Sequence, residues 1–382
     1  MLGYLKWSKL VPVPQLGGRT LISLSEMGER VFALAWLVAL AVLVGAALLR
    51  MGRHEAWWMV ALVGVLISQC LIVVAWSDAK FGTIANASIL VAVSISVAQA
   101  RFGQRVDAEA RALLARGAGK GSILERAEIG GLPLPVQKWL VRSGVVGRER
   151  ARTVRLKQRG DLRTKPGGAW MPARAEQYFS VEPPAFLWKV DTRMAGVLPI
   201  VGRDEYVDGR GNMLIKAAAL VSVVDAADEK IDHGSMLRFL GEMVWFPSAA
   251  TSPYVAWEAI DDTRAKATMR SGGSEASAVF TFDAQGRVVG LRAERYLGGG
   301  AEAALTPWVV SCSEYRRFEG VEVPSRGEVG WELASGYFAY YRWEILEVQF
   351  DRAELYEHDS DRERGAEPVV RAAPSRPEGA LP

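Results

Sequence analysis

Glu242 is the residue in this sequence whose surroundings most favour chemistry. Its neighbours are apolar, with Met243 next to it and Trp245 close by. A carboxyl group that loses its hydration has a raised pKa, and such a group can act as a general acid or base. His233 and Asp261 are the side chains that could complete a hydrolase-type site for a lipid-like substrate. That site requires the three groups to converge within hydrogen-bond reach in one cleft.

A structural interpretation of each residue stands beside the catalytic one. Glu242 can pair with an arginine, Arg203 or Arg238, and so fix a helix to a sheet. His233 fits a capping or surface position, and the acidic pair that starts at Asp261 is typical of a turn. The sequence has no Gly-x-Ser-x-Gly motif, which would mark the nucleophile of an α/β-hydrolase. We therefore assign no catalytic residue and favour binding over catalysis.

Histidine and cysteine usage argues against a metal centre and against an internal disulfide. The three histidines are not spaced as zinc or copper ligands usually are. One cysteine lies in an apolar segment and the other far along the chain, so a bridge between them is implausible. The histidines are His54, His233 and His358, and the cysteines are Cys70 and Cys312. The sequence predicts no metal and no cofactor.

Aromatic residues carry the strongest indication of binding. They exceed what one face of a thin sheet can hide, so they either fill a packed core or line an apolar cavity. The set comprises Trp170, Tyr178, Phe179, Phe186, Trp188, Trp245, Phe246, Trp257, Trp308, Trp331, Tyr341 and Trp343. The candidate ligand-binding residues are Trp188, Arg203, Tyr206, Glu242, Trp245 and Trp257.

Three apolar segments near the N-terminus predict transmembrane helices at about 31–49, 56–76 and 83–99, after a polar segment 1–30. Two of them are close in length to the roughly 20 residues that a bilayer core requires, and the third is shorter. None contains Asp, Glu, Lys or Arg in its interior. The segments therefore predict a multi-pass membrane anchor and not a transport pathway.

Basic residues predict the side of the membrane on which the rest of the chain lies. Residues 101–165 hold sixteen Lys or Arg against six Asp or Glu. Arg50 and Arg53 add to this side, while Arg19, Arg30 and Lys80 lie on the other. The positive-inside rule then places the large domain in the cytoplasm, at the plasma membrane. Basic residues beside a bilayer also attract anionic lipid headgroups, although a solvated basic face would look the same.

The hydrophobic period changes to two at Thr153, which predicts strands with one buried face. About a dozen strands with short links follow to residue 350, and an antiparallel sheet of that size must curl. In the last strand the apolar register slips after Ile345, as a β-bulge requires. Residues 234–244 have helical spacing, with Asp232 as the predicted cap, so one helix covers the concave face.

The sequence thus predicts three transmembrane helices followed by an α+β domain dominated by a large curled antiparallel sheet, half-barrel-like, with a covering helix. We expect a helical linker over 101–129, the β-rich domain over 130–352 and a disordered tail over 353–382. The tail is expected because that stretch is charged and rich in proline.

Several short motifs resemble those of an uncharacterised bacterial family of unknown function. They are Leu132-Pro133 with Trp139, Tyr206 with Gly209 and Gly211, the segment 240–249, Trp257, and the hairpin 78–83. The resemblance covers most of residues 56–350 and brings no activity with it. The strand count and the single covering helix are also similar to LolA-like and LolB-like lipoprotein-carrier half-barrels. That similarity implies a hydrophobic cavity that holds acyl chains.

The function that these patterns favour is a membrane-tethered binding module for a lipid or another apolar small molecule. Membrane lipids are the expected partners. A hydrolase-type enzyme on a lipid-like substrate and an anchored scaffold for a protein partner are the alternatives. Nucleic-acid binding is not expected, because the basic stretch lacks the motif of a known reader.

Overall fold

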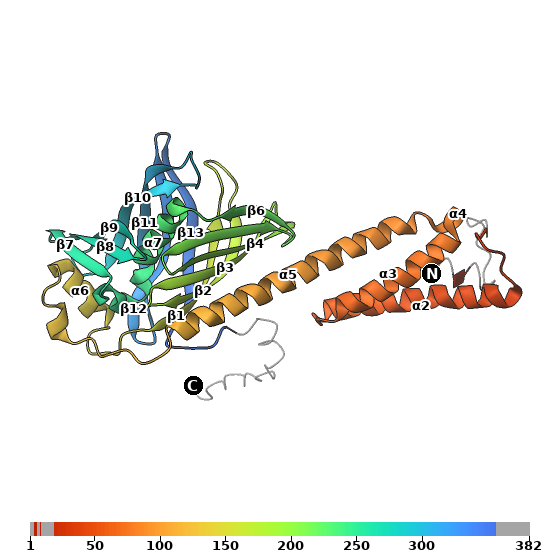
Figure 1. Ribbon diagram of the computed structural model, residues 1–382, viewed down its shortest axis with the longest axis horizontal. Helices are drawn as coiled ribbons and strands as arrows, with labels where there is room; N and C mark the ends of the chain where they lie inside the picture. Colours follow the sequence, from red (N-terminus) through yellow and green to blue (C-terminus); the bar gives the residue numbers. More distant parts are fainter. Residues whose placement is uncertain (1–3, 6–7, 9–18, 357–382) are drawn as a thin grey trace, which may run out of the picture.

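The computed structural model describes residues 4–5, 8 and 19–356. Three helices near the N-terminus are long and apolar enough to cross a membrane: α2 (Glu26–Met51), α3 (Trp57–Val74) and α5 (Gly82–Arg116). They form the elongated bundle of Figure 1, with the short α4 (Trp76–Ala79) in the connection between α3 and α5. Gln69 joins α3 to α5, because it donates to Thr83 Oγ1 at 3.2 Å and accepts from Asn86 Nδ2 at 2.9 Å.

The helix α5 continues without a break from the bundle into the β-rich domain. Its 35 residues span about 50 Å at 1.5 Å per residue. The predicted third span and the first part of the predicted linker therefore form a single helix, which ends at Gly117. The second half of α5 buries Phe102, Val106 and Leu113 against the sheet.

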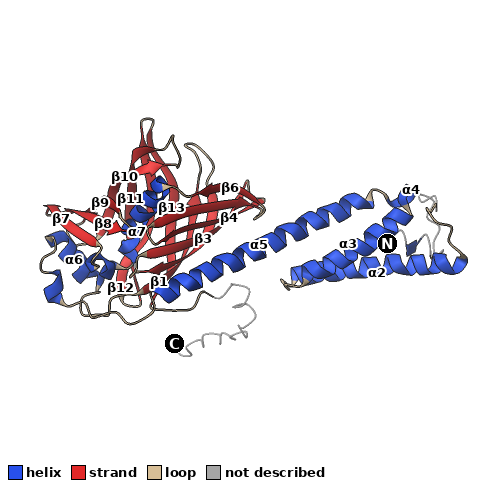
Figure 2. Cartoon of the chain, viewed as in Figure 1, coloured by secondary structure: helices blue, strands red, loops and turns tan. Residues whose placement is uncertain are grey.

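Thirteen strands form a single sheet in which all neighbours are antiparallel. The order is β6-β5-β4-β3-β2-β1-β13-β12-β11-β10-β9-β8-β7, and Figures 1 and 2 show how strongly the sheet curls. Pairing of β1 with β13 joins the first and last strands. The strands are β1 (Thr153–Leu162), β2 (Met171–Ser180), β3 (Ala185–Met194), β4 (Leu198–Val207), β5 (Arg210–Ala217), β6 (Val221–Ala226), β7 (Val255–Asp261), β8 (Arg264–Ser271), β9 (Ser274–Phe282), β10 (Val288–Leu297), β11 (Ala304–Phe318), β12 (Val321–Leu333) and β13 (Gly336–Phe350).

The predicted curled sheet and its curvature device are confirmed. Lys157 pairs with Glu347 but Gln158 pairs with Ile345, so Leu346 is the extra residue of a bulge in β13. The turn between β5 and β6 divides the region 212–224 into two strands. Ala218 and Ala219 have φ values of 51° and 57°, and this left-handed backbone turns the chain.

The covering helix α7 (Glu229–Glu242) starts five residues earlier than predicted. Its N-cap is Asp228, whose carboxylate accepts from the backbone N–H groups of Lys230 and Ile231. Asp232, the predicted cap, lies inside the helix and binds Arg210 at 2.9 Å and the backbone N–H of Gly211 at 2.6 Å. The helix lies between β4 and β5 on one side and β8, β9 and β10 on the other. It therefore fills the concave side of the curled sheet.

Shorter elements close the base of the half-barrel. They are η1 (Arg126–Ile129), α6 (Leu134–Ser143), η2 (Met243–Trp245) and η3 (Pro247–Thr251). After β13, Tyr356 packs beside Tyr178, with 6.2 Å between ring centroids. The predicted tail beyond Tyr356, and most of the polar segment before residue 19, fall outside the described residues.

Candidate functional site

The concave face of the sheet is a packed aromatic core. Phe179, Phe186 and Tyr206 point inward from β2, β3 and β4, and each is fully buried. Phe239 of α7 packs against them, with its ring centroid 6.3 Å from Phe179 and 6.4 Å from Tyr206. The predicted aromatic set thus contributes here to a core that α7 completes.

A buried polar network crosses this core and joins α7 to the sheet. Arg238 donates to Asp204 Oδ2 at 2.6 Å and to Glu242 Oε1 at 2.8 Å. Glu242 also accepts from Gln177 Nε2 at 2.6 Å. Burial raises the pKa of Glu242, and the attraction of Arg238 offsets only part of that rise. The pairing with Arg238 is the structural role considered for Glu242 from the sequence.

The network extends to β1, β3 and β13 through Gln158. Its carbonyl oxygen accepts from Tyr341 Oη at 2.8 Å and from Trp188 Nε1 at 3.4 Å, while its amide donates to Gln177 at 3.2 Å. The Arg238 guanidinium lies 4.7 Å from the centroid of the Trp188 ring, within reach of a cation–π interaction. These hydrogen bonds tie α7 to the sheet, and within the described chain Asp204 Oδ1 is a buried member of the network without a hydrogen-bond partner.

The six predicted ligand-binding residues do not form one open site. Trp188, Tyr206 and Glu242 lie together on the concave side. Trp245 packs against Trp343 at 5.2 Å between centroids, and Trp257 packs against Phe280 at 5.2 Å near α6. Arg203 points to the opposite, convex face, where it pairs with Glu205 at 2.6 Å and with Glu109 of α5 at 3.2 Å.

The hydrolase-type constellation does not assemble either. His233 and Glu242 are nine residues apart in α7, which is about 13 Å along the helix axis. His233 packs against Tyr296 at 5.6 Å between centroids, and Asp261 pairs with Arg264 at 2.7 Å in the β7–β8 turn. No group of three or more His, Cys, Asp or Glu in the described part of the chain could hold a metal ion.

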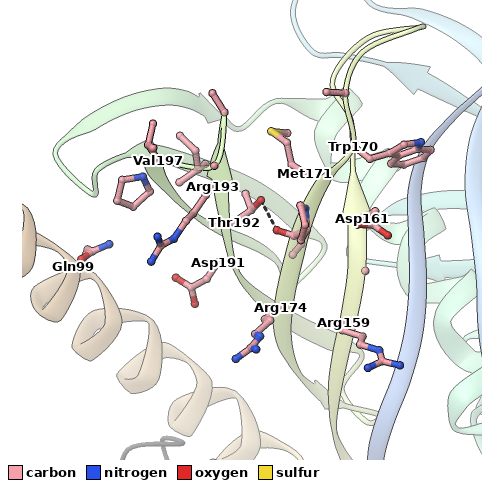
Figure 3. Close-up of a pocket in the computed structure, with 18 of the residues that line it drawn as sticks. Gln99, Arg159, Asp161, Trp170, Met171, Arg174, Asp191, Thr192, Arg193 and Val197 are labelled. Carbon is pink, nitrogen blue, oxygen red and sulfur yellow. Dashed lines mark hydrogen bonds between the residues drawn. The ribbon is translucent and has the colours of Figure 1, made fainter. Parts of the chain in front are cut away.

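An open cleft of about 1460 Å³ lies between the convex face of the sheet and the apolar helices. Figure 3 shows its two walls, with Gln99 on α5 facing Arg193 and Val197 on the sheet side. The sheet wall comes from β1, β2, β3 and β13 and from the turn between β3 and β4. The helix wall comes from α5, from Arg50 in the last turn of α2 and from Trp57 at the start of α3.

Positive charge dominates this cleft, because six arginines line it against three carboxylates. Arg159 pairs with Glu344 at 2.7 Å and Arg342 with Glu328 at 2.7 Å. Within the described part of the chain, Arg174 and Arg193 form no ion pair, and both are exposed. Their guanidinium donors are therefore available to an anionic group.

The helix wall of the cleft combines the apolar Trp57, Ala92 and Ile95 with the polar Arg50, Ser96 and Gln99. Ala92, Ile95, Ser96 and Gln99 are spaced by three, one and three residues, so they lie on one face of α5. Trp57 extends this wall, with the guanidinium of Arg50 5.4 Å from its ring centroid. The cleft thus combines apolar surface with arginines, which is the chemistry that an anionic amphiphile needs. Sequence reasoning missed it, although the alternation after Thr153 already placed Arg155, Lys157 and Arg159 on one face.

The fold and the cleft define a half-barrel protein with a long apolar helical extension. The chain belongs to the family of unknown function DUF6544, whose model matches residues 122–343, more than half of the sequence. This confirms the resemblance drawn from the motifs around Trp139, Tyr206 and Trp257. No curated protein matches the chain.

Solved structures that align with this chain include a LolA superfamily protein and a DUF1329 family protein. A LolA superfamily protein from Nitrosomonas europaea aligns at a TM-score of 0.35 and 11% identity, over 56% of this chain and 93% of its own. A DUF1329 family protein from Desulfovibrio piger aligns at a TM-score of 0.34 and 9% identity, over 57% and 93%. Structural similarity at these TM-scores does not indicate a ligand for this chain.

Proposed function

We propose that this protein is a membrane-tethered binding module for an anionic lipid, which it holds in the cleft between the convex face of the sheet and the apolar helices. The observation that carries the proposal is the composition of the two walls. Exposed arginines line the sheet wall, and the helix wall offers the apolar side chains of Trp57, Ala92 and Ile95. Such a cleft matches a molecule with a charged head and an apolar body.

The tether follows from the length and composition of α2, α3 and α5. The loop between α2 and α3 lies on the same side of the bundle as the second half of α5, because α3 and α5 run in opposite directions. Arg50, Arg53, Arg101 and Arg105 would then lie at the membrane surface beneath the sheet. By the positive-inside rule this side is the cytoplasmic side.

The cleft residues divide the recognition of a lipid between them. Arg174 and Arg193 would donate hydrogen bonds to headgroup phosphate oxygens, since a guanidinium fits a phosphate with two parallel donors. Ala92, Ile95 and Trp57 would contact the start of the acyl chains. Asp191, which pairs in register with Arg174, lowers the net charge of this wall and so disfavours doubly charged ligands relative to singly charged ones.

The concave side is a weaker candidate for the lipid site. A ligand there would have to displace α7, which would separate Arg238 from Asp204 and Glu242. Removing a partner from a buried ion pair costs about 3–5 kcal/mol, whereas the cleft is already open.

Titration of the full chain in detergent with phosphatidylglycerol, followed by native mass spectrometry, tests the proposal. Each basic residue near a membrane surface contributes about 1 kcal/mol, so Arg174→Gln with Arg193→Gln should weaken binding about 30-fold. Arg264→Gln with Arg270→Gln is the matched control, because these arginines lie on β8, outside the cleft. It should leave the affinity unchanged.

Two outcomes would count against the proposal. Equal affinity in the cleft variant and the wild type would remove the arginines from lipid recognition. Equal binding of phosphatidylcholine, whose headgroup has no net charge, would show that the cleft does not select anionic lipid.

A further inference from the structure

Two neighbouring turns at one end of the sheet expose apolar side chains that nothing in the described chain covers. They connect β3 to β4 and β5 to β6 and form an apolar rim of Met194, Val197, Leu198, Leu220 and Val221. Val197 is 78% exposed and Val221 is 64% exposed. The backbone N–H of Ala218 donates to the Pro199 carbonyl at 2.7 Å, which holds the two turns together. A contiguous apolar group of this kind marks a contact surface.

The position of the apolar rim relative to α5 is fixed by ion pairs. Arg203 of β4 pairs with Glu109 of α5 at 3.2 Å, and Asp208 at the end of β4 pairs with Arg116. Lys189 of β3 adds a pair with Asp107 at 2.9 Å. Together with the buried residues of α5, these contacts lock the sheet to the helix that continues into the apolar bundle.

The same ion pairs also show which residue of α5 lies beside the apolar rim. From Arg203 to Asp208 is five residues of strand, and from Glu109 to Arg116 is seven residues of helix. Val197 lies six residues before Arg203 in the chain. Because five residues along β4 match seven residues of α5, these six residues correspond to about eight residues of the helix. Eight residues before Glu109 is Arg101, where the apolar part of α5 ends.

The cleft supports this placement independently. Val197 lines it together with Ile95 and Ser96, which belong to the apolar part of α5. Figure 1 shows the ends of β4 and β6 turned toward the helical bundle. The apolar rim therefore lies where the membrane surface would meet the domain.

We propose that the apolar rim inserts into the bilayer at the boundary between headgroups and acyl chains, so that the sheet docks on the membrane beside α5. This inference rests on the tethering part of the proposed function but not on a lipid in the cleft. Arg193, one residue before Met194, is placed to contact the surrounding headgroups. The insertion would hold the mouth of the cleft against the lipid surface.

The proposal predicts a gradient of depth from the β3–β4 turn along the exposed strand β6. Val223 of β6 is also exposed, at 58%, but it lies beside the part of β5 that pairs with Val201 and Gly202. That position is four to five strand residues from Val197, or about 9 Å along α5 on the same scale. Val223 should therefore lie above the headgroups while Val197 lies among them.

Site-directed fluorescence in nanodiscs holding one copy of the full chain each tests this gradient. Single cysteines are introduced by Val197→Cys, Val221→Cys and Val223→Cys after Cys70→Ser, and each is labelled with a polarity-sensitive dye. Cys312 stays in place, because burial raises the pKa of its thiol to about 12 and a buried thiol is inert at neutral pH. Lipids spin-labelled near the headgroup serve as the quencher for the rim positions, and lipids spin-labelled in the acyl chain serve for the label at position 90, which lies about 16 Å deeper than Arg101 along α5.

We expect most of the fluorescence to be lost at position 197, less at 221 and little at 223. Ile260→Cys, an exposed apolar position on the far edge strand β7, is the negative control, and Leu90→Cys on α5 is the positive control for tethering. Labels at 197 and 221 that respond like the label at 260 would overturn docking. A label at 197 that reports an apolar environment but is not quenched by spin-labelled lipid would also overturn it. The second result would mean that protein covers the rim.

The same preparations separate this inference from the proposed function. In the double variant Arg174→Gln with Arg193→Gln, a label at 197 that stays quenched while the affinity for phosphatidylglycerol is lost would support each of the two proposals separately. Unquenched labels at 197 with normal quenching at 90 and normal lipid affinity would overturn docking alone. An unquenched label at 90 would refute the tether itself.

Discussion

Both faces of the curled sheet carry arginines, but these arginines differ in exposure and in ion pairing. On the concave face, Arg238 is 16% exposed in its side chain and has two carboxylate partners. On the convex face, Arg174 and Arg193 are exposed and form no ion pair in the described chain. Arginine thus closes one face and leaves the other open to an anionic partner.

This difference is the reason why we propose a binding site outside the hollow of the curled sheet. The hollow of this domain already has an occupant, α7, which belongs to the same chain. The cleft that we propose as the binding site lies instead where the sheet meets the apolar helices.

Removal of the central cation from the concave network should have the largest effect. Arg238→Met leaves Asp204 and Glu242 buried without their shared partner, which costs about 3–5 kcal/mol. For a domain of this size we expect the midpoint of thermal unfolding to fall by about 10 °C. Circular dichroism of the full chain in detergent measures it.

Arg264→Met is the matched control for this experiment. Arg264 also pairs with an aspartate, but its side chain is 52% exposed, so the substitution should cost less than about 1 kcal/mol. Equal midpoints for Arg238→Met and the wild type would mean that the network does not hold α7 in place.

Truncation of one aromatic residue on each face should sharpen the comparison. Phe239→Ala removes a fully buried ring from the concave core, and such changes cost about 3–5 kcal/mol. Trp170→Ala removes a ring that lies between Arg163 and Arg342, at 4.3 Å and 4.4 Å, beside the cleft. Because Trp170 is only half-buried, we expect a loss of stability several times smaller, with weaker phosphatidylglycerol binding.

Similar destabilisation by the two substitutions would remove the distinction between a structural and a binding face. The unfolding midpoint and the lipid affinity of each variant, measured on the same preparation, make the test. Phe239→Leu, which keeps an apolar side chain of moderate size, should recover part of the lost stability.

Much of the fold could be predicted from the sequence because local patterns specify it. The switch to a period of two, the single helical segment and the register slip after Ile345 each follow from alternation in one stretch of chain. The continuation of α5 was missed because Arg101 ends the hydrophobic span. Beyond that point the apolar positions of the helix, such as Phe102 and Val106, pack on strands that lie far along the chain.

The candidate site was harder to predict, for two separate reasons. Arg203 and Tyr206 are three residues apart in one strand, and the period of two already places them on opposite faces. The alternation of the strand therefore argues against grouping them in one site. The cleft, by contrast, combines residues of α2, α3, α5 and several strands, and only the tertiary arrangement brings these together.

Acid should destabilise the concave side through His233. Burial, with a smaller contribution from the nearby Arg295 charge, lowers the pKa of His233 below its ordinary value of 6.5. The unfolded chain therefore binds the proton more readily than the folded chain. The stabilisation that comes from neutral His233 is complete above pH 6.5 and is lost as the pH falls through the lowered pKa.

Thermal unfolding at a series of pH values between 7.5 and 5 measures this effect. His233→Asn removes the titrating group, so the fall of the midpoint on acidification should be smaller in the variant than in the wild type. An identical pH profile in the two proteins would assign the acid sensitivity to other groups. His54, in the connection between α2 and α3 and not on the concave side, provides the control substitution His54→Asn.

The smallest effect should come from an ion pair on the convex face. Glu328→Gln removes the partner of Arg342, whose side chain is 55% exposed, and exposed pairs contribute about 0.2–1 kcal/mol. Stability should therefore hardly change, while release of Arg342 beside the cleft should strengthen phosphatidylglycerol binding. A large loss of stability in denaturant unfolding would show that the convex pairs support the sheet as the concave network does. Unchanged lipid affinity would instead place Arg342 outside the recognition of the headgroup, with Arg174 and Arg193 left as its proposed contacts.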